Sequence, residues 1–187
     1  MVQFRRMITS FDEVAADLPT EILGLCQAYI DQIALFDERI GALDHEIKGQ
    51  AKTDEATSRL TTVPGVGPIC ATTIQAFAPP MEKFSNGREF AVRCGLVPRQ
   101  KSTGGRQILG RTSKMGQRDI RRLLITGAMA VIRWAIRKGP PPRSWLAKMP
   151  AHKPSMRVAT ALANKLARPV WALTTSKQNY RIPPLPA

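Results

Sequence analysis

The chain has 187 residues, with 28 lysines and arginines against 14 aspartates and glutamates, and a formal net charge of +14. No apolar run approaches the ~20 residues that a membrane-spanning helix needs, and no signal-peptide pattern opens the chain, so we expect a soluble, intracellular protein. Such an excess of cations predicts a polyanionic partner. Nucleic acid is the leading candidate, because its phosphates attract lysine and arginine in a salt-dependent way.

The charge is divided unevenly along the chain. Residues 1–55 carry 5 cationic and 11 acidic side chains, a net of −6, whereas residues 56–187 carry 23 and 3, a net of +20. We therefore expect a mainly α-helical protein in three parts. These are an acidic, coiled-coil arm at 1–56, a basic domain at 57–178 and a flexible, proline-rich tail at 179–187.

The three cysteines do not suggest a metal site. Cys26, Cys70 and Cys94 are widely spaced, each among apolar neighbours, and His45 and His152 are far from them in the sequence. No pair has the spacing of zinc ligands. We expect core thiols and no bound metal.

The arm carries a heptad repeat. Its apolar positions alternate at intervals of four and three residues, with polar positions between them: Ile22, Cys26, Tyr29, Ile33, Phe36, Ile40, Leu43 and Ile47. A narrow stripe of this kind is typical of a coiled coil, so we predict a homo-oligomer that forms through residues 22–47. The alternative is that the same stripe packs on the chain's own body as a long core helix. Residues 49–57 are interpreted as the joint to the next part.

Residues 57–77 predict a helix-hairpin-helix. Pro64 fixes its φ angle and ends the first helix, and Pro68 stands where the first position of the next helix is expected. Gly65 and Gly67 supply turn conformations and carry no side chain that would keep a phosphate from the main chain. We therefore predict that Gly65, Val66 and Gly67 bind a nucleic-acid backbone through their amides. The alternative is a tight turn between two packed helices.

Residues 95–118 form a basic, glycine-rich stretch without any carboxylate. We interpret it as a loop that follows a short helix capped by Ser85, and whose amides and cations surround phosphates. An ordinary solvated loop is the alternative, although a loop of this length inside a compact domain is uncommon unless it is functional or disordered. The predicted phosphate ligands are Arg99, Lys101, Thr103, Gly104, Gly105, Arg106, Arg111, Ser113, Lys114 and Arg118.

Two long amphipathic helices are predicted beyond this loop, at about 116–138 and 155–174. The first has Arg118, Arg121 and Arg122 in its first turns, where positive charge opposes the helix dipole. We predict that an anion docks there, with a solvated cationic face as the alternative. Pro169 is expected to kink or shorten the second helix. The three tryptophans are interpreted as core residues rather than as stacking platforms: Trp134, Trp145 and Trp171.

Several linked motifs follow one another along the chain. They are VPGVGP at 63–68, FSNGREFA at 84–91, GLVPRQKSTGG at 95–105, LGRTSKMGQRDIRRLL at 109–124 and ALANKLAR at 161–168. In this order they closely resemble the C-terminal half of the IS-one-ten (IS110) family of insertion-sequence transposases. The resemblance covers about residues 20–181, and a set of motifs in order is far more specific than a hairpin alone.

The resemblance implies a transposase that moves a mobile element by cutting and rejoining DNA, in the bacterial cytoplasm at the nucleoid, with a structured guide RNA that chooses donor and target. In this family a RuvC-like domain binds magnesium through Asp and Glu, and the C-terminal domain supplies a serine nucleophile. The matching serine is Ser102. The chemistry suits its neighbours, because Arg99, Lys101, Arg106 and Arg111 would screen the phosphate charge. Ser113 is the second candidate, with helix capping as its alternative role.

This chain also departs from the family pattern. The carboxylates of residues 1–55 lie on the predicted arm, and nothing there matches the RuvC-like domain, so we expect no cofactor in this chain. A two-site enzyme without one site should bind DNA but not complete strand exchange. We therefore expect a truncated and inactive copy. Two other hypotheses are a non-catalytic nucleic-acid-binding module and a dimerising inhibitor of full-length transposase.

Overall fold

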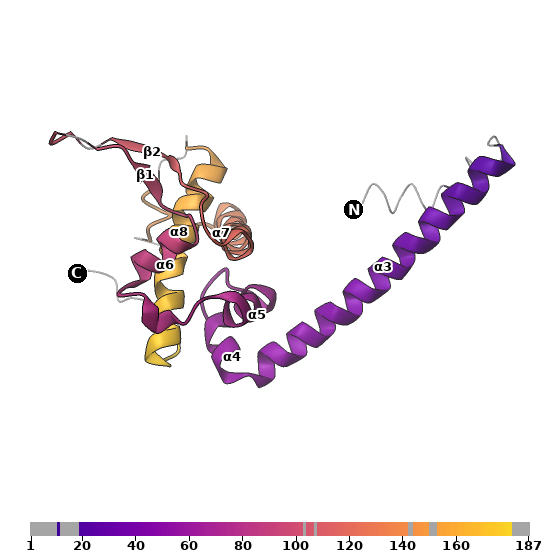
Figure 1. Ribbon diagram of the computed structural model, residues 1–187, viewed down its shortest axis with the longest axis horizontal. Helices are drawn as coiled ribbons and strands as arrows, with labels where there is room; N and C mark the ends of the chain where they lie inside the picture. The colour runs from indigo at the N-terminus through magenta and orange to yellow at the C-terminus, as the bar shows by residue number, and fades with distance from the viewer. Residues whose placement is uncertain are drawn as a thin grey trace. The chain divides into compact units, whose positions relative to one another are not determined.

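The computed structural model describes residues 11, 19–102, 104–106, 108–141, 144–149 and 153–180. It is mainly helical, as predicted, with a small two-stranded sheet (Figure 1). Residues 1–46 and 47–187 form two compact units. In chain order the elements are α3 (Thr20–Thr53), α4 (Glu55–Thr61), α5 (Pro68–Phe77), the 3₁₀ turn η1 (Met81–Lys83), α6 (Gly87–Arg93), β1 (Pro98–Gln100), β2 (Leu109–Thr112), α7 (Arg118–Lys138) and α8 (Ser155–Ser176).

The predicted joint at 49–57 is helical, which corrects the sequence interpretation. α3 continues to Thr53, and α4 begins immediately after Asp54. The Asp54 carboxylate caps α4 by accepting hydrogen bonds from the Thr57 hydroxyl, at 2.5 Å, and from the Thr57 amide, at 2.7 Å. These bonds favour the charged carboxylate and lower the pKa of Asp54. The chain therefore passes from one helix to the next without a loop.

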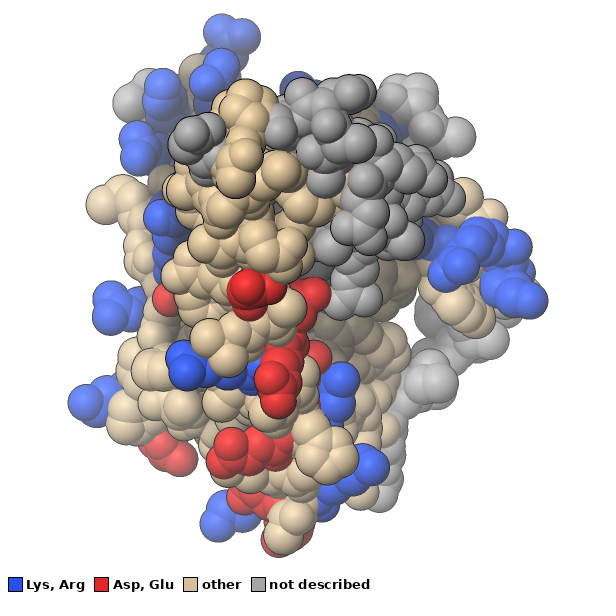
Figure 2. Space-filling model, turned by 90° about the vertical axis from the view of Figure 1, so that its right-hand side faces the viewer, with Lys and Arg blue, Asp and Glu red and all other residues tan. Residues whose placement is uncertain are grey.

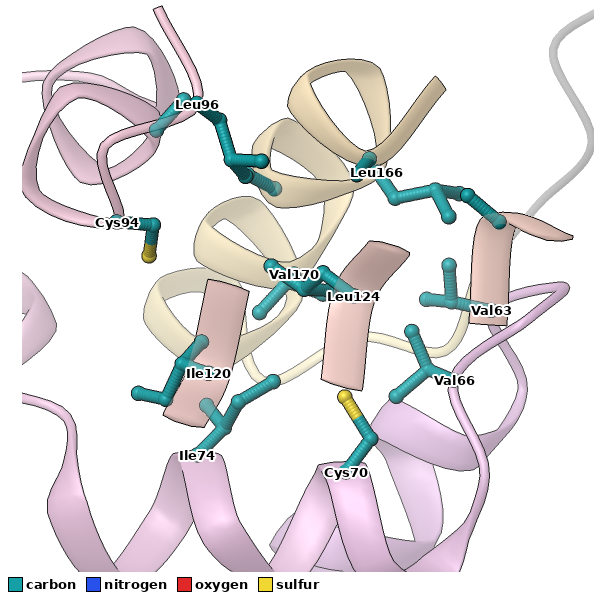
Figure 3. Close-up of a cluster of buried hydrophobic side chains, with 14 of the residues drawn as sticks. Val63, Val66, Cys70, Ile74, Cys94, Leu96, Ile120, Leu124, Leu166 and Val170 are labelled. Carbon is teal, nitrogen blue, oxygen red and sulfur yellow. The ribbon is translucent and has the colours of Figure 1, made fainter. Parts of the chain in front are cut away.

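The core of the second unit forms between α7 and α8, with α4, α5 and α6 packed around them. Ile120 and Leu124 of α7 meet Val170 of α8 and Ile74 of α5 in the cluster drawn in Figure 3. All four side chains are buried. Burying side chains of this size stabilises the fold by roughly 1.5–3 kcal/mol each. This core holds α7 in place, and α7 carries several of the predicted site residues described below.

The two long helices confirm the predicted periodicity. α8 buries all five apolar positions expected of it: Val158, Leu162, Leu166, Val170 and Leu173. Pro169 does not shorten α8, which continues to Ser176. On α6 the cap is Asn86 rather than Ser85, because the Asn86 side chain accepts hydrogen bonds from the amides of Arg88 and Glu89.

Cys70 and Cys94 are core thiols, as predicted (Figure 3). Burial raises the pKa of each thiol to about 12, which keeps both thiols protonated at neutral pH. We expect both cysteines to resist iodoacetamide in the folded protein, and half-exposed Cys26 to react first. Mass spectrometry of the alkylated peptides measures this, and all three should react in guanidinium. Equal rates for Cys26 and Cys94 in the folded chain would contradict the expectation.

The interpretation of all three tryptophans as core residues is wrong for Trp134. Trp134 on α7 is 51% exposed. Trp145 and Trp171 are half-buried against the core, and the Trp171 indole donates a hydrogen bond to the Met81 carbonyl at 3.1 Å. Among the helices that the structure describes, none is long and apolar enough to cross a bilayer.

Candidate nucleic-acid interface

The basic stretch at 95–118 contains a two-stranded antiparallel ribbon, β1 paired with β2, where the sequence analysis expected a loop. Pro98 lies opposite Thr112, and Gln100 lies opposite Leu109, with an irregularity between them. Gly104 and Gly105 have φ angles of 57° and 79°, and space around both is open. Glycine permits these angles and so allows the chain to turn back between the strands.

The ribbon displays most of the predicted phosphate ligands together. Its exposed cations are Arg99, Lys101, Arg106 and Arg111. The exposed backbone of Gly104 and Gly105 lies at the turn between the strands. Thr103, also predicted as a ligand, lies outside the described residues. Because no carboxylate occurs between residues 95 and 118, nothing within the stretch neutralises these cations, and the ribbon is suited to a polyanion.

Two tight glycine contacts hold the base of the ribbon. Gly116 has a φ angle of 95°, and a Cβ there would lie 1.9 Å from the Arg93 carbonyl oxygen. Gly95 has a φ angle of 69°, and a Cβ there would lie 2.1 Å from the Met115 carbonyl oxygen. Real Cβ atoms essentially never lie closer than 3.0 Å to such a neighbouring heavy atom. Only glycine therefore fits at either position. The two ends of the basic stretch therefore meet beside α6.

Side chains from α7 and α8 donate hydrogen bonds to backbone carbonyls at the same base of the ribbon. The Arg121 guanidinium donates to the Cys94 carbonyl at 3.1 Å, and Asn164 of α8 donates to the Leu96 carbonyl at 3.1 Å. Arg121, predicted as a nucleic-acid ligand, is half-buried and engaged within the protein. Arg118 and Arg122 are exposed on the first turns of α7. The base of the ribbon is thus held in place by the protein, and the exposed Arg118 and Arg122 belong to the same helix as Arg121.

Ser102 lies on the ribbon just after β1 and is exposed. Its hydroxyl donates a hydrogen bond to Gln100 Oε1 at 3.1 Å and accepts one from the Ile108 amide at 3.1 Å. The Gln100 amide oxygen is uncharged and is not a general base at neutral pH. In this arrangement Ser102 is accessible to a phosphodiester, and the described residues of the ribbon offer cations but no base in contact with the hydroxyl.

Ser113, the second candidate nucleophile, is half-buried at the base of the ribbon. Its amide donates to the Val97 carbonyl at 3.0 Å. It is not the cap of α7, as the sequence analysis had allowed, because that helix begins at Arg118 and Gln117 occupies the cap position. Neighbouring Lys114 is exposed and has a φ angle of 53°.

The turn between α4 and α5 places its glycines differently. Gly65, with a φ angle of 88°, packs against α7, and a Cβ on Gly127 would lie 1.7 Å from the Gly65 carbonyl oxygen. The side chain of Val66 is buried. Gly67 is exposed at the N-cap of α5, with no atom within 4 Å of a Cβ placed there. Pro68 takes the first helical position, as predicted. Only Gly67 of the predicted trio offers an open approach.

Side chains of both charges are visible on the face that Figure 2 displays, and lysines and arginines lie next to some of the carboxylates there. Within the described part of the chain, no group of three or more His, Cys, Asp or Glu side chains could hold a metal ion.

Several residues that contribute to this arrangement were not predicted from the sequence: Arg93, Gln117, Gly127 and Asn164. Gly127 could have been found, because glycine inside a helix costs about 1 kcal/mol relative to alanine and usually has a packing reason. The Gly104–Gly105 pair is likewise a hairpin signal. The backbone contact at Arg93 and the long-range bond of Asn164 leave no such signal in the sequence.

The fold and this surface define a mainly helical domain with a cationic ribbon. Residues 57–141 match the transposase IS116/IS110/IS902 family. This segment of the chain belongs to that family, as the resemblance indicated.

Relatives named as transposases match most of the chain. It is 41% identical over 166 residues to a probable family 20 transposase of Pseudomonas aeruginosa, and the match covers 89% of this chain and 49% of that protein. The transposase for insertion sequence element IS1111A of Coxiella burnetii is 37% identical over 178 residues, 91% of this chain and 49% of that protein. The transposase for insertion sequence element IS1328 of Yersinia enterocolitica is 33% identical over 159 residues, and the match covers 85% of this chain and 48% of that protein. The chain spans about half the length of these curated relatives.

Proposed function

We propose that this chain is the DNA-handling part of an insertion-sequence transposase, with Ser102 as its nucleophile. The observation that carries the proposal is the exposed serine on a ribbon of four cations within the family-matched segment. The Ser102 oxygen would attack a backbone phosphorus and form a phosphoserine ester. The P–O bond to a deoxyribose oxygen breaks and that oxygen leaves as a hydroxyl, so that the proton lost by the serine is balanced by the proton gained by the leaving oxygen. The ribbon cations stabilise the extra negative charge of the transition state.

The same proposal includes a second site that this part of the chain does not provide. Gln100 cannot take the serine proton, and the described residues hold no cluster of metal ligands. We therefore propose that the chain by itself binds DNA and a structured guide RNA, and that strand exchange needs magnesium held by carboxylates outside the described residues. This is the role that the family resemblance gives to a RuvC-like domain.

Covalent capture tests the nucleophile. The chain is incubated with MgCl₂, labelled duplex DNA from the flanks of its gene and RNA transcribed from those flanks, together with an intact relative that supplies the second site. Denaturing electrophoresis then detects protein joined to DNA at the mass of this chain. We expect Ser102→Ala to abolish the adduct and to change affinity by no more than about twofold, since a neutral hydroxyl neutralises no phosphate.

Ser113→Ala is the matched control, because it removes the second serine of the same stretch. It should leave the adduct intact. If the adduct disappears with Ser113→Ala and survives in Ser102→Ala, the assignment is wrong.

A non-catalytic nucleic-acid-binding module is the second candidate function. It is favoured by the bond from Ser102 to the Gln100 side chain, because this acceptor is uncharged and is not a base. Under this alternative the wild-type chain binds DNA in the capture assay but forms no adduct, and Ser102→Ala behaves as the wild type in every respect.

We also propose that α3 forms a homo-oligomer through the predicted heptad. Five of its eight apolar positions are at least 45% exposed along the helix: Ile22, Tyr29, Phe36, Ile40 and Leu43. Burying such a row against a second copy of α3 would remove this apolar surface from water. Dimers and tetramers are distinguished by light scattering of the purified chain.

A further inference from the structure

Trp134 lies on α7, about two helical turns beyond the point where this helix contacts the turn that joins α4 and α5. Gly127 of α7 touches Gly65 of that turn, and Val131 is also close, with its Cγ2 2.9 Å from where a Gly65 Cβ would be. Trp134 follows Gly127 by seven residues, which places it about 20° away around the helix and about 10 Å further along it. The indole therefore continues the face of α7 against which the turn packs.

The indole differs from the other two in having no described partner. Trp171 donates a hydrogen bond to Met81, and the Trp145 ring lies 5.6 Å from the Lys165 ammonium. For Trp134 the described residues provide neither a hydrogen bond nor a ring or cation contact, and half of its surface is open to solvent. A large aromatic surface of this kind is available to a ligand.

Two exposed cations lie to one side of the indole around the helix. Arg133 and Arg137 are exposed on the neighbouring positions of α7, about 100° and 60° from Trp134 around the helix. Residues 120–187 contain no aspartate or glutamate, so no carboxylate in that part of the chain neutralises them. An aromatic ring flanked by arginines is how proteins hold single-stranded nucleic acid, with the base on the ring and phosphates on the cations.

We propose that Trp134 stacks an unpaired nucleotide of single-stranded DNA or RNA. The phosphates beside that nucleotide contact Arg133 and Arg137. This inference rests on the proposed nucleic-acid function and deepens it, because it distinguishes unpaired strands from duplex. The ribbon with Ser102 takes no part in the stacking contact.

The test compares binding of a short fluorescent oligothymidylate with binding of the matching duplex, using the full chain. We expect Trp134→Ala to lower affinity for the single strand about tenfold, the contribution of one stacked base, and to leave duplex affinity within about twofold. Trp134→Phe keeps a ring and should retain most of the affinity. It should also lose the quenching of intrinsic fluorescence that binding produces in the wild type. Ile136→Ala is the matched control, since Ile136 is 76% exposed on the opposite side of α7.

The outcomes separate this inference from the function on which it rests. A wild-type chain that binds neither probe at low salt overturns both. In a second case the wild type binds both probes, and Trp134→Ala lowers the affinity for both equally or changes neither affinity. Either result overturns the stacking role and leaves the proposed function standing. If Trp134→Ala alters only self-association in light scattering, the indole forms a protein contact, and the stacking role is again overturned.

Discussion

Gly127→Ala is expected to destabilise the second unit by about 2–3 kcal/mol, the upper range for forcing extra atoms into a packed site. The new Cβ would lie 1.7 Å from the carbonyl oxygen of Gly65, so α7 and the turn must separate by more than about 1 Å to reach an ordinary contact. Both sides of the contact are backbone, which cannot rotate away as a side chain can. Thermal unfolding followed by circular dichroism measures the loss.

The sign of this change is informative because the same substitution elsewhere should act in the opposite direction. Gly41 is also inside a helix, but nothing lies within 4 Å of a Cβ placed there. Gly41→Ala is expected to leave stability unchanged or to raise it by up to about 1 kcal/mol through helix propensity. Equal effects of Gly41→Ala and Gly127→Ala would show that the contact between Gly65 and α7 is not tight.

The fold was predictable where periodicity alone decides it. Ile120 and Leu124 on α7, and Val158 and Leu162 on α8, recur at helical spacing and are buried as expected. Trp134 shows the limit of this argument. It stands next to buried Ala135 in the sequence, and periodicity locates the centre of an apolar stripe but not its width.

The candidate site was predictable in composition but not in shape. The cations were singled out because a stretch without carboxylates is visible in the sequence, and Ser102 was singled out because the family resemblance implies a serine nucleophile there. Their arrangement on a ribbon was not found, because β1 and β2 have three and four residues and show no alternation of apolar and polar positions. The packing of Gly65 was also not visible in the sequence, because its close contact is with Gly127, which is distant in the sequence.

Removing the ribbon cations is expected to weaken duplex DNA binding and its salt dependence together. The variant replaces with glutamine the four exposed cations of the ribbon: Arg99, Lys101, Arg106 and Arg111. If each neutralises one phosphate, the slope of log K against log salt should fall by about 3.6 in magnitude. These contacts alone would account for a fall in wild-type affinity of about 150-fold between about 50 and 200 mM salt. Fluorescence anisotropy across a salt series measures both quantities.

A variant of equal charge separates the ribbon from a general effect of net charge. It replaces with glutamine four exposed cations outside the ribbon: Lys148, Lys153, Arg157 and Lys177. Loss of long-range attraction should affect the two variants alike, since both lower the net charge by the same amount. If the ribbon contacts phosphates directly, the slope of log K against log salt falls in the ribbon variant and not in the variant outside the ribbon. A matching fall in slope for both variants would mean that DNA is held by the basic surface as a whole, and Ser102 would then lose the local clamp that brings a phosphodiester to it.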